Sequence, residues 1–416
     1  MEKIKAPWYY LTLLILAGES VFFLPYVLSR IFRPTVLEVF EINNVELGLC
    51  FSVYGMVAII SYLFGGPIAD KYPPRKLIAV ALWLTSLGGL IYASFPSFFV
   101  LKVLYGYWGF TTVFLFWAPM IKAARLWGAS TSQLKAFGWL EGGRGIVGAI
   151  IGTIGVFIFA LIVNEDVVSV GIQQNRAAFK YVIYFTSILV AFVGVFVWFL
   201  MRFKGSKEVV LDKIELNQMF EVLKLPSVWL LMVIIMCAYM GYKTTDVISL
   251  YARDVMKYSQ VKSAQVATFL LYARPVIAIF VVLFFSRLEA AFLLFIGFVI
   301  SFLGALLFSS GVISGSMPLL FMLSILVLAI GVYALRALYF SVMEKGQIPI
   351  LLTGTAVGLI SLVGYAPDIF SGPMIGYLLD HYPGIEGHQY VFFVLALFSF
   401  FGALASWRYH VLYKAN

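Results

Sequence analysis

The chain is a succession of long apolar runs separated by short polar breaks, many of which contain Gly or Pro. Each run is long enough to cross a bilayer as an α-helix, which takes about 20 apolar residues. The pattern predicts an all-α membrane protein with 12 transmembrane helices. We place these helices at residues 8–31, 46–69, 75–94, 98–121, 134–162, 179–201, 227–250, 262–286, 288–310, 317–342, 349–379 and 389–412.

The longest polar stretch lies near the middle of the chain and divides the predicted helices into six and six. Apolar residues from Leu216 to Leu223 recur there at helical spacing, which predicts an amphipathic helix on the membrane surface. Two halves of six indicate an internal duplication with a pseudo-two-fold relation, as in many secondary transporters. We predict an N-terminal six-helix bundle at 1–201, a cytoplasmic linker at 202–226 and a C-terminal six-helix bundle at 227–416.

Composition narrows the class of protein. Of the 416 residues, 62% are hydrophobic and 12% are charged, whereas a soluble domain is about 45–50% apolar and about 25% charged. This excludes a water-soluble enzyme, and the absence of a basic block outside the apolar runs excludes a nucleic-acid-binding protein. If both termini are cytoplasmic, Lys and Arg favour that side roughly two to one. We therefore expect a protein of the plasma (bacterial inner) membrane with both termini in the cytoplasm.

No cofactor or metal is expected. Cys50 and Cys237 lie inside apolar runs, without the neighbouring Cys and His residues that a disulfide framework or a zinc site needs. A phosphate-binding loop of the Gly-x4-Gly-Lys-Ser/Thr type is also missing, so ATP is not the expected source of energy. A gradient of an ion or a solute has to drive any transport.

Charged residues inside the predicted helices are the candidates for function. Each costs roughly 2.5–3.5 kcal/mol at the bilayer centre, so it has to face another charge or a water-filled cavity. Four acidic and four basic residues are so placed: Glu19, Glu141, Arg144, Lys243, Asp246, Arg274, Arg336 and Asp368.

Three of the basic residues are candidates for binding a negatively charged substrate. Arg144 lies one helical turn after Glu141, and this pair is either a structural ion pair or an anion site that Glu141 orients. Lys243 has the same spacing to Asp246, and their contact is either permanent or opened by a substrate carboxylate or phosphate. Arg274 precedes Pro275, whose kink can turn it inward.

The remaining charged residues are candidates for coupling or gating. Glu19 has no charged neighbour in the sequence, so it either carries a coupling proton or stays neutral and hydrogen-bonded to another helix. Arg336 and Asp368 lie farther from the membrane centre and fit a gate or a structural pair. Glu141 and Asp246 join this coupling set as partners of the cations.

Aromatic residues that share helices with these charges are candidates for the walls of a substrate cavity, although most aromatic residues serve packing. The four that we single out are Tyr26, Trp117, Tyr239 and Tyr242.

The connection from Gly66 to Lys76 resembles the signature loop of the major facilitator superfamily. Gly66 is followed at the family spacing by Asp70 and the basic Lys71, and then by Arg75 and Lys76; Pro73-Pro74 replaces the usual Gly-Arg. The resemblance implies a cytoplasmic gate in which Asp70 lies near the start of the eleventh helix. It also implies that Arg75 pairs with acidic or carbonyl groups.

The segment from Lys102 to Gly106 is similar to the family motif Arg-x-x-Gln-Gly, which makes Lys102 a further gating candidate. The run from Phe116 through Gly145 is similar to bacterial members of the nitrate/nitrite- or sugar-phosphate-transporter-like branch. The family resemblance implies a monomer that works by alternating access.

We therefore expect a secondary transporter for a small polar solute, anionic or zwitterionic, coupled to protons. Two alternatives stay open. One is an exporter of lipophilic compounds, which buried Arg and Lys disfavour. The other is a receptor or sensor that has kept the fold and lost transport.

Overall fold

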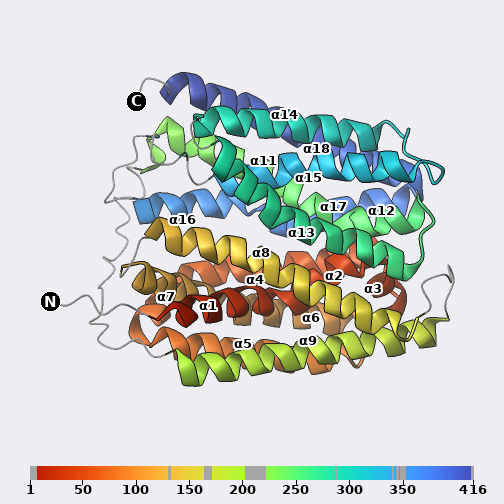
Figure 1. The fold of residues 1–416 in the computed structure, drawn as a ribbon, viewed down its shortest axis with the longest axis horizontal. Coiled ribbons are helices and arrows are strands. Elements are labelled where there is room, and N and C mark those ends of the chain that lie inside the picture. Colours follow the sequence, from red (N-terminus) through yellow and green to blue (C-terminus); the bar gives the residue numbers. More distant parts are fainter. Residues whose placement is uncertain are drawn as a thin grey trace. The chain divides into compact units, whose positions relative to one another are not determined.

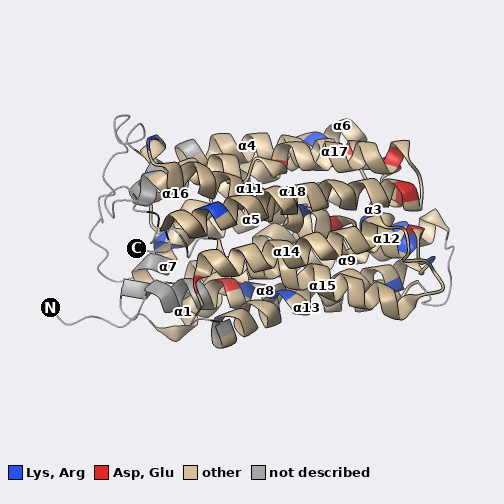
Figure 2. Cartoon of the chain, turned by 90° about the horizontal axis from the view of Figure 1, so that it is seen from above, with Lys and Arg blue, Asp and Glu red and all other residues tan. Residues whose placement is uncertain are grey.

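Every regular element in the described part of the chain is helical, as the computed structural model shows. The structure describes residues 7–129, 133–163, 171–201, 222–285, 288–339, 342, 346 and 353–413. The predicted amphipathic helix of the linker lies largely outside them. Eleven helices in this part are long and apolar enough to cross a membrane. Lys, Arg, Asp and Glu are sparse along their middles (Figure 2). The predicted all-α membrane fold is confirmed.

The chain forms two compact units. Unit 1 comprises Met1–Leu211 and Tyr258–Pro275, and unit 2 comprises Asp212–Lys257 and Val276–Asn416. Within each unit the helices run alongside one another (Figure 1). The elements of unit 1 are α1 (Trp8–Phe22), the π-helical η1 (Phe23–Val27), α2 (Leu28–Ile31), α3 (Arg33–Val39), α4 (Asn44–Lys71), α5 (Pro74–Tyr92), α6 (Phe98–Gly109), the π-helical η2 (Phe110–Phe114), α7 (Trp117–Ala129), α8 (Gln133–Ala160) and α9 (Ile172–Leu200).

The helix α13 (Gln260–Phe285) contributes to both units, with the boundary at Pro275. Its first half is built into the core of unit 1, where Val261, Ala264 and Leu271 are buried with residues of α2. The elements of unit 2 are α11 (Pro226–Thr244), the 3₁₀-helical η3 (Thr245–Val247), α12 (Ile248–Asp254), the second half of α13, α14 (Ala290–Ser309), α15 (Pro318–Leu338), α16 (Thr353–Gly364), α17 (Pro367–His381) and α18 (Ile385–Tyr413).

Local sequence explains several helix ends. Asn43 and Glu46 form a capping box before α4: Asn43 Oδ1 accepts from the Glu46 N–H at 2.8 Å, and Glu46 Oε2 accepts from the Asn43 N–H at 3.0 Å. The helices α5, α11, α15 and α17 each have Pro in the first turn, where no intrahelical N–H is needed.

The predicted helix 349–379 is not continuous. It consists of α16 and α17, which are separated by a turn at Tyr365 and Ala366. Pro367 starts the second segment and has no N–H to bond the Val363 carbonyl, which accepts instead from the Ala366 N–H at 3.1 Å. The two segments together correspond to the eleventh predicted helix, because neither alone is long enough to cross a membrane.

Candidate functional site

Four charged side chains of unit 1 meet where α1, α8 and α13 come together. Arg144 lies at the centre, with Nη1 2.7 Å from Glu141 Oε1 and Nε 3.5 Å from Glu19 Oε2. Arg274 reaches the same Glu141 carboxylate from α13, with Nη2 3.2 Å from Oε2. The Glu141 carboxylate therefore bridges two guanidinium groups, and Glu19 binds the first of them separately.

The four side chains differ in exposure. Glu19, Arg144 and Arg274 are buried, whereas the Glu141 side chain is 51% exposed. The exposed apolar residues of α8, such as Trp139, lie on its opposite face at about 100° per residue. An ionised carboxylate avoids hydrocarbon. Glu141 thus opens toward water, and the apolar face of α8 is left for lipid.

Glycines let α1 and α8 approach closely enough for this cluster to form. A Cβ atom at position 148 would lie 2.6 Å from Glu19 Oε1, and one at position 18 would lie 3.1 Å from Arg144 Cδ. A third glycine, Gly145, faces Pro275 of α13, where a Cβ atom would lie 3.0 Å from the proline Cδ. These glycines therefore allow close packing of the helices and also make room for the buried charges.

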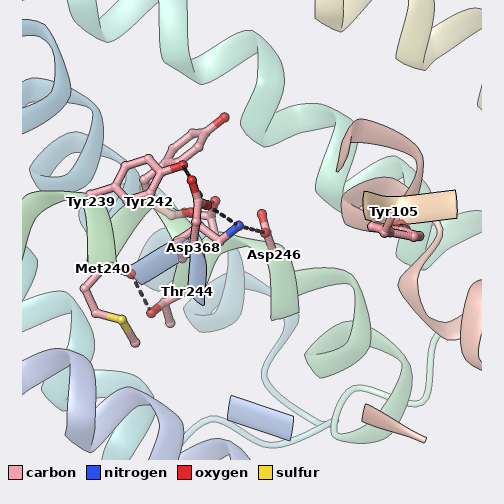
Figure 3. A network of polar contacts seen from close by, with 10 residues as sticks. Tyr105, Tyr239, Met240, Tyr242, Thr244, Asp246 and Asp368 are labelled. Carbon is pink, nitrogen blue, oxygen red and sulfur yellow. Dashed lines mark hydrogen bonds and ion pairs between the residues drawn. The ribbon is translucent and has the colours of Figure 1, made fainter. Parts of the chain in front are cut away.

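A second charged cluster lies in unit 2 (Figure 3). Lys243 Nζ is 3.1 Å from Asp368 Oδ1 and 3.9 Å from Asp246 Oδ2. The Tyr239 hydroxyl donates to both oxygens of Asp368, at 3.0 and 3.1 Å. One ammonium group is thus shared by two carboxylates, and Asp368 is the one held more closely.

Aromatic rings surround this second cluster. Tyr239 stacks on Tyr242 at a centroid distance of 5.8 Å and meets Tyr365 edge to face at 4.8 Å. The Arg336 guanidinium lies 3.9 Å from the centre of the Tyr242 ring, which is a cation–π contact. Tyr239, Tyr242 and Arg336 therefore belong to one constellation with Lys243, and Tyr365 is a member that the sequence reasoning missed.

The predicted aromatic residues of unit 1 lie less directly at the charges. Trp117 contacts Phe22 at 6.2 Å, and the Arg144 guanidinium lies 5.6 Å from the Phe22 ring. Tyr26 stacks on Phe51 at 5.3 Å and meets Tyr54 at 4.6 Å. Phe22, which the sequence reasoning missed, is an aromatic residue that contacts Arg144; its position one turn after Glu19 was the available signal.

The candidate gating residues are placed in part. Arg75 Nη1 donates to the carbonyl of Trp198 at 3.2 Å, which links the start of α5 to the end of α9. Lys102 Nζ lies 4.5 Å from the centre of the Phe98 ring. The side chains of Asp70 and Lys71 lie outside the described part. Next to them, Lys122 donates to the Ala69 carbonyl at 2.7 Å, where a cation suits the C-terminal end of α4.

A polar network that the sequence reasoning missed joins α13 to α3 in unit 1. Gln260 Nε2 donates to Glu38 Oε2 at 2.8 Å, and Gln260 Oε1 accepts from the Thr35 hydroxyl at 3.0 Å. Asn175 Nδ2 donates to the other oxygen of Glu38 at 3.0 Å. Residues so distant in the sequence give no local signal of this contact.

The structure decides pairings that the sequence left open. Glu19, which has no charged neighbour along the chain, lies against Arg144. Asp368, expected farther from the membrane centre, is the nearer carboxylate to Lys243. Within the described residues, no group of three or more His, Cys, Asp or Glu could hold a metal ion.

Membrane-crossing helices that bury balanced charges between them are the architecture of a membrane transporter. The sequence profile of the Major Facilitator Superfamily matches residues 11–371. The chain belongs to this superfamily of transporters, and it is not an enzyme. The family that the Gly66–Lys76 loop indicated is thereby confirmed.

Two curated relatives come from Escherichia coli strain K12. The inner membrane protein YqcE is 27% identical over 394 residues, which cover 92% of this chain and 89% of the relative. The inner membrane protein YihN is 26% identical over 412 residues, which cover 97% and 95%. With the apolar helices described above, these matches identify an integral membrane protein.

Solved structures share the fold. A mutant of the nucleoside transporter NupG aligns with a TM-score of 0.75 and 15% identity, covering 96% of this chain and 99% of that one. An inward-facing, unoccupied bacterial homologue of the human lysosomal transporter Spinster aligns with a TM-score of 0.68 and 16% identity, covering 96% of each chain.

Proposed function

We propose that this protein is a secondary transporter for a small polar solute that carries a negatively charged group. The observation that carries the proposal is the pair of buried guanidinium groups, Arg144 and Arg274, that converge on one half-exposed carboxylate. Guanidinium groups recognise carboxylates and phosphates through paired, charge-assisted hydrogen bonds. Two buried arginines would repel a lipophilic cation, so an exporter of such compounds is disfavoured.

We further propose that protons drive the transport and that unit 2 binds the coupling proton. Lys243 lies within 4 Å of both Asp368 and Asp246. A proton on either carboxylate leaves the other to neutralise the ammonium group, so the cluster can hold one proton while its ammonium group stays paired. Glu19, the other candidate, is supported less well because Arg144 holds it in an ion pair.

We also propose that both termini face the cytoplasm and that the protein works as a monomer. The bias of Lys and Arg toward that side supports the orientation. Fusions of alkaline phosphatase and of green fluorescent protein to the C-terminus test it, since the phosphatase is active only outside the cytoplasm. Light scattering of the purified protein in detergent tests the monomer.

Uptake by proteoliposomes tests the proposed function. Amino acids, sugar acids, phosphorylated sugars and nucleosides are offered with and without an inward proton gradient. We expect uptake of an anionic or zwitterionic solute that the gradient accelerates. Uptake of lipophilic cations alone would contradict the proposal. Binding of a solute without flux would favour a receptor or sensor.

A further inference from the structure

Glu141 differs from the other members of the unit 1 cluster. Arg144, Arg274 and Glu19 are buried, but Glu141 is 51% exposed on the side of α8 opposite its apolar face. A half-exposed carboxylate is already partly hydrated, so it can move into water more easily than two buried guanidinium groups can. Glu141 is therefore the one member of the cluster that can leave while the others stay in place.

The contacts of Glu141 define the shape of what could replace it. Its Oε1 atom binds Arg144 Nη1 at 2.7 Å, and its Oε2 atom binds Arg274 Nη2 at 3.2 Å. Each guanidinium group takes one oxygen, so the two arginines are spaced for a group with two oxygens on one carbon. A substrate carboxylate can occupy this position without rearranging either arginine.

The charges of the cluster limit the net charge of a group that could replace Glu141. When Glu141 moves away, Arg144 and Arg274 carry two positive charges and Glu19, 3.5 Å from Arg144, carries one negative charge. Among these side chains, one further negative charge restores neutrality. A dianion such as a phosphate monoester would give Arg144, Arg274 and Glu19 an excess negative charge, which is unfavourable among buried groups.

We propose that Glu141 is a built-in counter-ion that holds the place of a substrate monocarboxylate between Arg144 and Arg274. The ligand displaces Glu141 on binding, and Glu141 displaces the ligand on release. This keeps the arginines paired in the empty state. The identification of that ligand as the transported solute rests on the proposed function; the local binding site does not.

Removing the counter-ion tests the site without knowledge of the substrate. In full-length, purified Glu141→Ala protein, formate supplies the missing carboxylate, and bound ligand raises the midpoint of thermal unfolding, Tm. We expect formate to raise the Tm of Glu141→Ala by several degrees more than that of the wild type. Sodium sulfate at equal ionic strength supplies the dianion, and we expect no such difference. Comparison with the wild type in the same salt removes general salt effects.

Two controls sharpen the test. Glu41→Ala removes another exposed carboxylate of unit 1, one that pairs with Arg176 at 2.7 Å. Formate should raise the Tm of this variant no more than it raises the Tm of the wild type. Adding Arg274→Gln to Glu141→Ala should abolish the response to formate. The inference is wrong if formate stabilises Glu141→Ala no more than the wild type, if sulfate works equally well, or if the response survives the loss of Arg274.

A second variant covers the case in which Glu141→Ala does not fold. Glu141→Gln keeps the shape but no longer competes by charge, so glucuronate should bind it about tenfold more tightly or better than the wild type. Glucose and glucose 6-phosphate are the matched neutral and dianionic probes, and calorimetry should show no gain for either. An equal gain for glucose 6-phosphate would overturn the assignment to a monocarboxylate.

The two proposals fail differently. If formate binds Glu141→Ala but proteoliposomes take up no solute, Glu141 is a built-in counter-ion and the proposed transport function is wrong. If proteoliposomes take up an anion but formate has no effect, transport stands and Glu141 is a structural partner of the arginines.

Discussion

The two units carry the same arrangement of charge with the signs exchanged. In unit 1 the first helix supplies an acid, Glu19, which faces a base, Arg144, on a later helix. In unit 2 the first helix supplies a base, Lys243, which faces an acid, Asp368, on a later helix. Unit 1 thus has a site that is rich in guanidinium groups, and unit 2 has a site in which two carboxylates share one ammonium group.

Both first helices also lose regular α-helical geometry just after the buried charge. Glu19 is followed by the π-helical segment Phe23–Val27, which contains a proline, and Lys243 by the 3₁₀-helical segment Thr245–Val247. Such irregular turns are frequent at functional sites. From the difference in sign and the shared irregularity we propose that the two units have different roles: unit 1 binds an anion and unit 2 binds a proton.

The largest expected effect is that of Arg144→Gln. This change leaves Glu19 buried without its guanidinium partner, and breaking a buried ion pair on one side costs about 3–5 kcal/mol. We expect a marked fall in Tm and loss of uptake of the anionic solute. Glu41→Gln, which affects an exposed pair worth about 0–1 kcal/mol, is the matched control. Equal stability of the two variants would remove the distinction between the buried cluster and an ordinary surface pair.

The next effect separates the two carboxylates of unit 2. Asp368→Asn removes the carboxylate that binds Lys243 at 3.1 Å, and Asp246→Asn removes the one at 3.9 Å. We expect Asp368→Asn to abolish acceleration by a proton gradient while exchange of solute across the membrane persists, and Asp246→Asn to have a smaller effect. Proteoliposome uptake with and without the gradient measures both. The reverse order would assign the coupling proton to Asp246.

A smaller effect is expected for Tyr239→Phe. The Tyr239 hydroxyl stabilises the charged form of Asp368 through two hydrogen bonds, and a bond to a charged group is worth about 1.5–3 kcal/mol. Without it Asp368 loses a partner that helps to hold it beside Lys243, so the acceleration of uptake by a proton gradient should weaken. Tyr251→Phe loses a buried hydroxyl that donates to the Ile313 carbonyl, and it should leave the acceleration unchanged. A weaker acceleration in both variants would mean that the effect is not specific to Asp368.

The smallest effect is expected at the network that joins α13 to α3. Gln260→Ala removes the contacts with Glu38 and Thr35, which should speed amide hydrogen exchange in residues 260–275. Lys262→Ala changes an exposed side chain of the same helix and is the control. Unchanged exchange in Gln260→Ala would show that packing of Leu271 and its neighbours alone holds this half of α13.

Most of the fold could be predicted from hydropathy, because a bilayer demands long apolar helices whose backbone groups are satisfied internally. The predicted helix 134–162 corresponds closely to α8. Hydropathy did not reveal the breaks at Phe23–Val27 and Tyr365, since a broken span is as apolar as a continuous one. The short helix α3 was also missed, because it is too short to leave a periodic signal.

The candidate charges could be predicted for a similar reason: an ionised side chain in an apolar run is costly enough to stand out. Their partners could not. Sequence spacing suggested the pairs Glu141–Arg144 and Lys243–Asp246, which lie one turn apart on the same stretch of chain. It gave no access to Glu19–Arg144 or Lys243–Asp368, whose members come from different helices.

The sequence by itself thus determined that this is a helical membrane protein with charges inside it, because the cost of exposing polar groups to hydrocarbon acts on each segment separately. Only the tertiary structure decided which charges meet. That outcome depends on how closely helices pack, as at Gly148, where a single methyl group would clash with Glu19. Such contacts join residues more than a hundred positions apart, and no local pattern encodes them.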